Sequence, residues 1–331
     1  MPVRKTETRI PAGTLGADLG EAFAAADGRC ALVSFITSPL AVGHENTYVV
    51  FVTDAGLASQ AQSFEWSFSE NGGIATTQST QVGEAAYTPQ NTGSLSVTVK
   101  LLDGSSTEQA TLSLTQAMVP LHPGLEALIA AATDQPGPGV SDPDVSRELV
   151  NDYNPYYQAV ALPTPEADDS FQQFVFNMLF EGATKTNPSD RKQLTEDLAQ
   201  ALDTVATDDF VNRTARGVGV CNIRLPLLAM IPASGAPLLP WTELPQATSQ
   251  NEFADQQLRQ KFAALDESAQ IDCFNLARFP KSNITQCAHI IAALRDHYFP
   301  GTNFSDVLTG MSGTRAFWIA NHFRQGPLST S

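Results

Sequence analysis

The C-terminal third of the chain carries residue types that bind zinc, namely Cys273, Cys287, His289 and His297. Thiolates and imidazoles are usual ligands of that metal. The surrounding pattern is helical, and residues two apart in a helix point about 200° apart. Cys287 would then face the core while His289 faces away. We therefore expect no metal site in this segment.

His289 and Asp296 have the chemistry of an imidazole–carboxylate pair for acid–base catalysis. They are seven positions apart and so lie on one stripe of the same expected helix. Two helical turns, roughly 10 Å, separate them. A direct hydrogen bond is out of reach, and a solvated helix face explains both residues.

A serine stands between glycines at 310–313, in the sequence Gly-Met-Ser-Gly. Serine hydrolases place their nucleophile in a G-x-S-x-G turn after an apolar strand, and the sequence has neither feature here. We interpret the segment as a flexible connection before a helix capped by Thr314.

The remaining polar candidates have simple explanations. Paired aspartates at 168–169 and 208–209 stand at expected helix starts, where the helix dipole favours carboxylates. N-x-S/T triplets begin at Asn212, Asn283 and Asn303, and without an export signal we attribute them to chance. The sequence thus defines no catalytic, cofactor-binding or metal-binding residue, and we expect no cofactor.

The four cysteines, Cys30, Cys221, Cys273 and Cys287, are spread along the chain. No pair has C-x-x-C spacing, and four cysteines in 331 residues do not make a disulfide scaffold. We expect buried free thiols. A bridge between Cys273 and Cys287 stays open as an alternative.

Composition indicates a weakly charged surface on a two-domain protein. A length of 331 residues suits two cores better than one. Charged residues make up 16%, against roughly 25% in typical soluble domains. The net charge of −16 divides into −6 over 1–117, −8 over 118–170 and −2 over 171–331. Nucleic-acid binding needs clustered Lys and Arg, so we expect none.

No stretch approaches the ~20 apolar residues of a membrane span. The longest apolar run, at 225–232, is short and holds two prolines. The basic residues at the start have no apolar region behind them, so we expect no cleaved secretion signal. We therefore expect a soluble, acidic protein without membrane insertion, cytosolic before assembly or release.

From 30 to 117 the pattern has the two-residue period of β-strands. In the clearest strand Leu95, Val97, Val99 and Leu101 point one way and the polar residues between them the other. About seven strands fit in this segment, which is typical of a β-sandwich.

Two segments, SFEWSFSENGG at 63–73 and EAAYTPQNTGSLSVTVKLLDGSS at 84–106, resemble a PKD-type immunoglobulin-like module. The resemblance covers residues 30–117 and implies that Trp66 is the core tryptophan of the third strand. It departs from the family where Glu70-Asn71-Gly72 replaces the usual Asp-Gly pair. A module of this kind implies a fold more than a function.

The remaining segments lie on either side of this module in the sequence. We expect residues 1–29 to form an N-terminal arm, extended over 1–14, and a short helix over 15–26. We expect residues 118–165 to form an acidic Pro-rich linker with a Pro/Tyr strap at 152–165. Residues 166–331 carry the i, i+3, i+4 pattern of a helical domain. The expected fold class is α+β multidomain: an N-terminal antiparallel Ig/PKD-like β-sandwich followed by a mostly α-helical domain.

Within residues 166–331 we expect helices that begin near Phe171, Pro188, Ser249 and Ser282, and a last helix over 314–325. Between them, 217–248 is apolar and Pro-rich without a helical period.

These features favour a non-enzymatic structural or adaptor component of a larger protein assembly, such as a phage-tail-like or contractile injection particle. Protein partners would bind the Ig-like module and the extended arms. The alternative is a helical hydrolase acting on cell wall or protein, with the β-sandwich as an accessory binding module. A histidine or other catalytic side chain with a hydrogen-bonded partner, in a deep pocket of the helical domain, would favour the enzyme.

Limited proteolysis tests the two-domain organisation. We expect the first cut between Gly137 and Asp144, because this segment is rich in Pro, Gly and acidic residues. Mass spectrometry should then find one β-rich and one α-rich fragment. Equal cutting throughout the helical region would contradict two independent cores.

Overall fold

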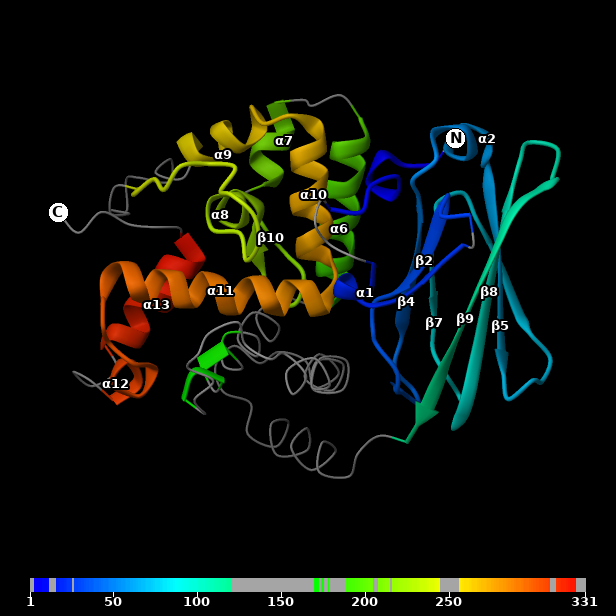
Figure 1. The fold of residues 1–331 in the computed structure, drawn as a ribbon, viewed down its shortest axis with the longest axis horizontal. Helices are drawn as coiled ribbons and strands as arrows, with labels where there is room; N and C mark the ends of the chain where they lie inside the picture. Colours follow the sequence, from blue (N-terminus) through cyan, green and yellow to red (C-terminus); the bar gives the residue numbers. More distant parts are fainter. Residues whose placement is uncertain are drawn as a thin grey trace. The chain divides into compact units, whose positions relative to one another are not determined.

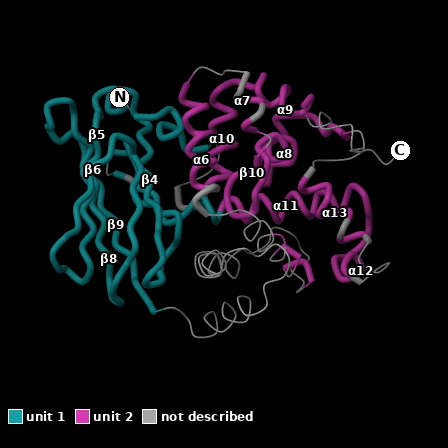
Figure 2. The backbone as a smooth tube through the Cα atoms, turned by 180° about the vertical axis from the view of Figure 1, so that it is seen from behind, with its two compact units in different colours: residues 1–138, 142–155, 279–281 teal, residues 139–141, 156–278, 282–331 magenta. Residues whose placement is uncertain are grey.

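The computed structural model describes residues 3–11, 16–25, 27–120, 170–172, 174–175, 178, 188–204, 208–214, 216–244, 256–309 and 314–325. The chain forms two compact units (Figure 2). Unit 1 holds the described residues 3–120 together with Phe279–Lys281, and unit 2 holds the other described residues. Sheets lie in the N-terminal half and helices in the C-terminal half, which confirms the predicted α and β content and its order.

Unit 1 consists mainly of two sheets (Figure 1), whose strand orders are β1-β2-β4-β7 and β3-β9-β8-β5-β6. Neighbouring strands are antiparallel except for the parallel pair β3 and β9. The strands are β1 (Glu21–Ala24), β2 (Cys30–Ser34), β3 (Leu40–Ala41), β4 (Asn46–Val52), β5 (Ser63–Glu70), β6 (Thr76–Thr80), β7 (Glu84–Tyr87), β8 (Gly93–Leu102) and β9 (Glu108–Val119). A short helix, α2 (Ala55–Gln60), connects β4 to β5.

The inner faces of the two sheets form one apolar core. Leu95, Val97, Val99 and Leu101 of β8 have no exposed surface, which confirms the predicted alternation. Trp66 of β5 is also fully buried. Its indole N–H donates to the Thr80 hydroxyl at 2.9 Å, so the ring is buried without an unpaired donor.

A buried polar network joins the two sheets. The Gln116 amide of β9 is 1% exposed, and its Nε2 donates to Glu21 Oε2 at 2.8 Å and to the carbonyl of Ile36 at 2.9 Å. Its Oε1 accepts the Tyr48 hydroxyl at 2.8 Å. Asn46 adds a bond to the Ser34 hydroxyl at 2.7 Å. Both buried amides therefore have partners, as burial of polar groups requires.

The helix predicted over 15–26 is correct only for α1 (Gly16–Leu19). Glu21–Ala24 form strand β1, in which Glu21 pairs with Ser34 of β2. The apolar spacing suits a helix, but strand β2 offers backbone N–H and C=O groups that need partners, and pairing with them decides the conformation.

The predicted extended arm over 1–14 is also corrected in its described part. Lys5–Glu7 form a 3-10 turn, η1, which contacts β4. Val3, Thr6 and Glu7 are buried in unit 1. Burial of these side chains makes the segment part of the folded unit.

Strand β4 is buried on both of its faces. The sequence predicts inward positions at Tyr48, Val50 and Val52, yet Phe51 on the opposite face is fully buried as well. The ring of Phe279, which belongs to unit 1, lies 5.8 Å from that of Phe51 and 4.4 Å from that of Phe35. The alternation of residues within β4 could not predict the contact of Phe51 with Phe279, which lies far along the chain.

Unit 2 is built mostly of helices and contains one short hairpin. Its elements are α6 (Pro188–Asp203), α7 (Asp208–Arg213), β10 (Gly217–Val218), β11 (Ile223–Arg224), α8 (Leu225–Met230), α9 (Gln256–Ala263), α10 (Glu267–Arg278), α11 (Pro280–Tyr298), α12 (Phe304–Thr309) and α13 (Thr314–Gln325). No helix in the described part of the chain is both long and apolar enough to cross a membrane.

Several helix predictions are confirmed, and two need correction. α6 begins at Pro188 and α13 spans 314–325, as predicted. α11 begins at Pro280 rather than at Ser282. The segment 217–248 contains the hairpin and α8, whose six residues are all buried, so no amphipathic period could mark it.

Four earlier predictions concern segments outside the described residues. They are the linker beyond residue 120, its strap at 152–165, the Ser249 cap and the 310–313 connection.

Replacing Trp66 by Ala should lower the free energy of unfolding of unit 1 by about 3–5 kcal/mol, because it removes a fully buried ring. Urea denaturation followed by circular dichroism measures the change. The matched control is Glu65→Ala at the neighbouring exposed position, with an expected effect below about 0.5 kcal/mol. Equal effects of the two substitutions would contradict the assigned orientation of β5.

Candidate functional site

The residues with zinc-ligand chemistry do not converge. Cys287 is fully buried in α11, whereas His289 is half-buried on the same helix. Within the described ranges, no three His, Cys, Asp or Glu side chains are placed to hold a metal ion.

All four cysteines are buried free thiols. Burial raises the pKa of Cys273 to about 12. The neighbour of Cys287 is Cys221, with which it shares a hydrogen bond; burial and this bond hold the pKa of Cys287 well above its ordinary value. The suggested bridge between Cys273 and Cys287 is therefore not formed.

His289 and Asp296 have separate environments on α11. Burial lowers the pKa of His289. Asp296 Oδ1 lies 2.8 Å from Arg295 Nε, which donates a hydrogen bond to it, and 2.7 Å from Arg295 Nη2. The imidazole–carboxylate pairing considered for His289 thus has no geometric support.

Two of the three N-x-S/T asparagines have structural roles. Asn283 is fully buried: its Oδ1 accepts the backbone N–H of Cys221 at 2.8 Å, and its Nδ2 donates to the carbonyls of Val218 and Ala277. Asn303 accepts the backbone N–H of Asp306 at 2.7 Å and so caps α12.

The third asparagine, Asn212, lies in α7, which begins at the predicted acidic pair 208–209. The other acidic pair, at 168–169, lies outside the described residues.

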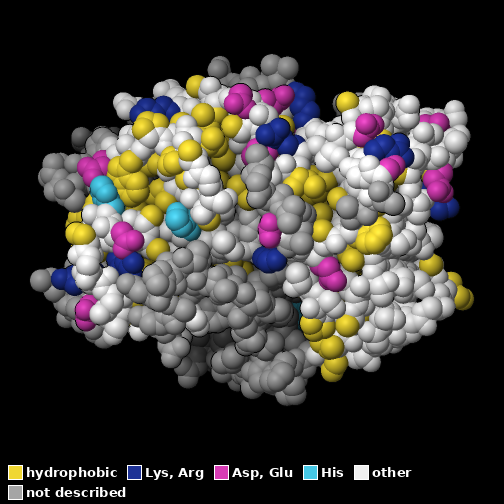
Figure 3. Space-filling view, viewed as in Figure 1, with side chains coloured by type: hydrophobic (Ala, Val, Ile, Leu, Met, Phe, Trp, Pro, Cys, Tyr) yellow, Lys and Arg dark blue, Asp and Glu magenta, His cyan; other side chains and the backbone are white. Residues whose placement is uncertain are grey.

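A cluster of aromatic and imidazole rings in unit 2 was not predicted. It joins three segments that are far apart in sequence: the loop after α8, the end of α11, and α13. Ring centroids lie 4.3 Å apart for Trp241 and His297, 4.2 Å for Tyr298 and His322, and 5.1 Å for Trp318 and His322. Figure 3 shows histidine side chains at the surface of the helical unit, close to hydrophobic side chains.

The cluster contains one surface imidazole–carboxylate pair. His297 Nε2 lies 3.1 Å from Glu243 Oε1, and the two side chains are 40% and 39% exposed. A carboxylate fixes the orientation and tautomer of such a ring, which is the arrangement of a general base. The pair is thus the feature of unit 2 with the clearest chemical capability.

His322 lies deeper in the same cluster. It is 1% exposed, and among the described residues neither of its ring nitrogens has a hydrogen-bond partner. Burial, aided by His297, lowers its pKa to about 4, so the ring is neutral at pH 7. The spacing of Trp318 and His322 along α13 places both on one face, but nothing in the sequence connects that face to Trp241 or His297.

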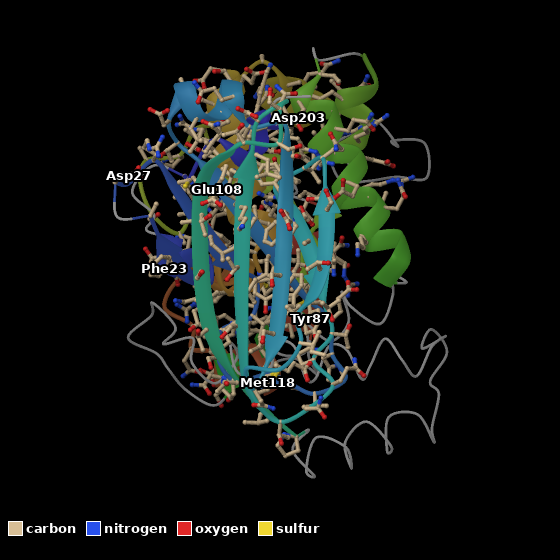
Figure 4. All side chains as sticks on the ribbon, turned by 90° about the vertical axis from the view of Figure 1, so that its right-hand side faces the viewer. Phe23, Asp27, Tyr87, Glu108, Met118 and Asp203 are labelled. Atoms are coloured by element: carbon tan, nitrogen blue, oxygen red, sulfur yellow. The ribbon has the colours of Figure 1, made fainter. Side chains whose placement is uncertain are left out.

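A second candidate is the outer face of the five-stranded sheet, whose strands face the viewer in Figure 4. The register gives this face rows of residues with hydroxyl groups. The register places Ser67 beside Thr98 and Thr98 beside Ser113, and in the next row Ser69, Ser96 and Thr115. These six residues form a block without charge. Thr98 and Ser113 share a hydrogen bond of 3.0 Å. In the second row, Ser96 and Thr115 are exposed on the surface.

Charged residues lie at one end of this hydroxyl face. Glu65 pairs with Lys100 in the register of β5 and β8, and the Lys100 ammonium lies 3.5 Å from Glu108. The charges of these three residues sum to −1. A partner that covers the face therefore buries hydroxyl groups, each able to donate and to accept, and avoids burying an unpaired charge.

No protein-family model matches the chain, and no curated protein matches it.

The buried imidazole predicts a pH dependence of stability. Because the pKa of His322 is lowered to about 4, the unfolded chain binds a proton between about pH 6.5 and pH 4 that the folded chain does not. Stability is therefore lost as the pH falls through this window, by at most ~1.4 kcal/mol per pH unit from this group. Urea denaturation at pH 7, 5.5 and 4.5 should show a shallower loss for His322→Phe than for the wild type. Equal slopes would contradict the buried neutral ring.

Proposed function

We propose that the chain is a non-enzymatic structural or adaptor component of a larger protein assembly, such as a phage-tail-like or contractile injection particle. The observation that carries this proposal is the uncharged hydroxyl face of the five-stranded sheet. A chain of net charge −16 repels other acidic surfaces, so a nearly neutral face is where a subunit can approach most closely.

The size of the face supports a protein partner. Its core strands β5, β8 and β9 are 8, 10 and 12 residues long. With about 3.3 Å per residue and about 4.8 Å between strands, these three strands offer roughly 480 Å². Covering them would bury about 950 Å² in total, which is the size of a weak or transient protein–protein interface.

The strand order supports an Ig/PKD-like assignment of this module. In this assignment β2, β4 and β7 would correspond to strands A, B and E of one sheet, and β5, β8 and β9 to C, F and G of the other. Trp66 then lies on strand C, in the core. The Glu70 carboxylate accepts the Tyr87 hydroxyl at 2.9 Å and the backbone N–H of Gln90 at 2.7 Å, and thereby supports the loop before β8.

The alternative is a helical hydrolase that acts on cell wall or protein, with the β-sandwich as an accessory binding module. The specific observation in its favour is the His297–Glu243 pair, which lies in unit 2 beside Trp241. The pair is a candidate general base only, because a hydrolytic site also needs an oriented nucleophile and an oxyanion donor.

Charge placed on the hydroxyl face tests the assembly proposal. Tagged full-length chain should be expressed in its source cells and its complexes separated by size-exclusion chromatography. We expect the wild type to elute well above its monomer mass of 35.4 kDa. Ser96→Arg and Ser113→Arg should each reduce the assembled fraction at least about tenfold, because burial leaves the new charge unpaired.

The matched control is Gln60→Arg, which adds the same charge at an exposed position on α2, away from the sheet face. It should assemble like the wild type. A monomeric wild type would contradict the proposal. Turnover of a peptide or glycan by the purified chain, abolished by His297→Ala, would replace it with the hydrolase.

A further inference from the structure

Two buried thiols of unit 2 touch each other. Cys221 lies in the turn of the hairpin between β10 and β11, and Cys287 lies in the middle of α11, 66 positions further along the chain. Their side chains share a hydrogen bond. Cys221 is 2% exposed and Cys287 is fully buried, and both are free thiols. Elements far apart in sequence therefore place two thiols beside each other.

Hydrogen bonds of the Asn283 side chain keep the hairpin turn beside α11. Asn283 lies one helical turn before Cys287, on the same face of α11. Its amide binds the backbone N–H of Cys221 at 2.8 Å and the carbonyl of Val218 at 3.0 Å, so it holds the hairpin turn against the helix.

The backbone of the turn is equally constrained. Gly219 has φ +72°, and a Cβ there would lie 2.2 Å from the carbonyl oxygen of Ala277. The turn therefore packs directly on the end of α10, and the two thiols cannot separate without breaking these contacts.

We propose that Cys221 and Cys287 form a disulfide when the protein meets a small-molecule disulfide such as oxidised glutathione. Cys221 lies in the hairpin turn next to Asn222, which is exposed, so local opening of the hairpin reaches this thiol first. The Cys221 thiolate attacks the reagent, forms a mixed disulfide and releases one glutathione thiolate. The Cys287 thiolate then attacks the Cys221 sulfur and releases the second.

The step is balanced without any further reactant. The two protein thiols lose two protons and two electrons, and the reagent disulfide is reduced to two glutathione thiols. The product ties the hairpin covalently to α11 and closes a long loop, which stabilises unit 2 by restricting its unfolded chain. The other two cysteines are Cys30, in β2 of unit 1, and Cys273, in α10.

Peptide mapping of the wild-type protein gives the direct test. The full-length chain is equilibrated with mixtures of reduced and oxidised glutathione, free thiols are alkylated, and a non-reducing digest is analysed by mass spectrometry. We expect one cross-linked peptide that joins Cys221 to Cys287, with Cys273 alkylated as a free thiol. The melting temperature should rise by about 5 °C or more on oxidation and return on reduction.

Variants separate the cross-link from other effects of oxidation. Cys221→Ala and Cys287→Ala should each abolish the shift in melting temperature, whereas Cys273→Ala, at an equally buried position, should keep it. Since mapping needs only the wild type, a variant that fails to fold leaves the test decisive. A stable glutathione adduct on Cys221, a cross-link through Cys273, or four free thiols under fully oxidising conditions would each overturn the proposal.

Discussion

The side-chain amide of Gln116 is a polar group enclosed between two sheets, and its hydrogen bonds determine how those sheets align. At 1% exposure it cannot bond to bulk water, so its partners must come from inside the protein. They are Glu21 of β1, Tyr48 of β4 and, after the end of β2, the carbonyl of Ile36. A misaligned sheet would leave the amide buried and unpaired, at a cost of roughly 1–3 kcal/mol. Polar contacts therefore add to apolar packing in specifying the arrangement of unit 1.

The same alignment decides what the protein presents to its surroundings. Alternate residues of a strand face opposite sides, so fixing Gln116 inward places Thr115 on the outside. Pairing then extends this choice across β8 and β5 and builds rows of hydroxyl groups from three strands. The uncharged block of six hydroxyl residues on this face thus depends on the same register as the buried network. The proposed role as an assembly component rests on this block, which forms only when the strands pair in the correct register.

Unit 2 relies on a comparable buried amide. Asn283 pairs with the backbone of the β10–β11 hairpin on one side and with the end of α10 on the other. Helix α11, which carries it, also contributes Cys287 to the thiol pair and His297 to the aromatic cluster. One long helix therefore positions both chemically notable features of the unit. Cys287 lies in its buried middle and His297 at its exposed end, so the two environments differ in solvent access and in the chemistry they permit.

The sequence by itself determined the features that repeat within one element: the alternation that buries Trp66 and its neighbours, the helix over 314–325, and the order of sheets before helices. Periodicity reports which face of an element is buried, because adjacent turns or pleats share that face. Periodicity wrongly predicted a helix over Glu21–Ala24, because this segment pairs with β2 and forms a strand. The meeting of Cys221 with Cys287, and the enclosure of His322 by rings from other segments, depended on tertiary structure alone. Such contacts join residues far apart in the chain, and no local pattern records which helices will pack together.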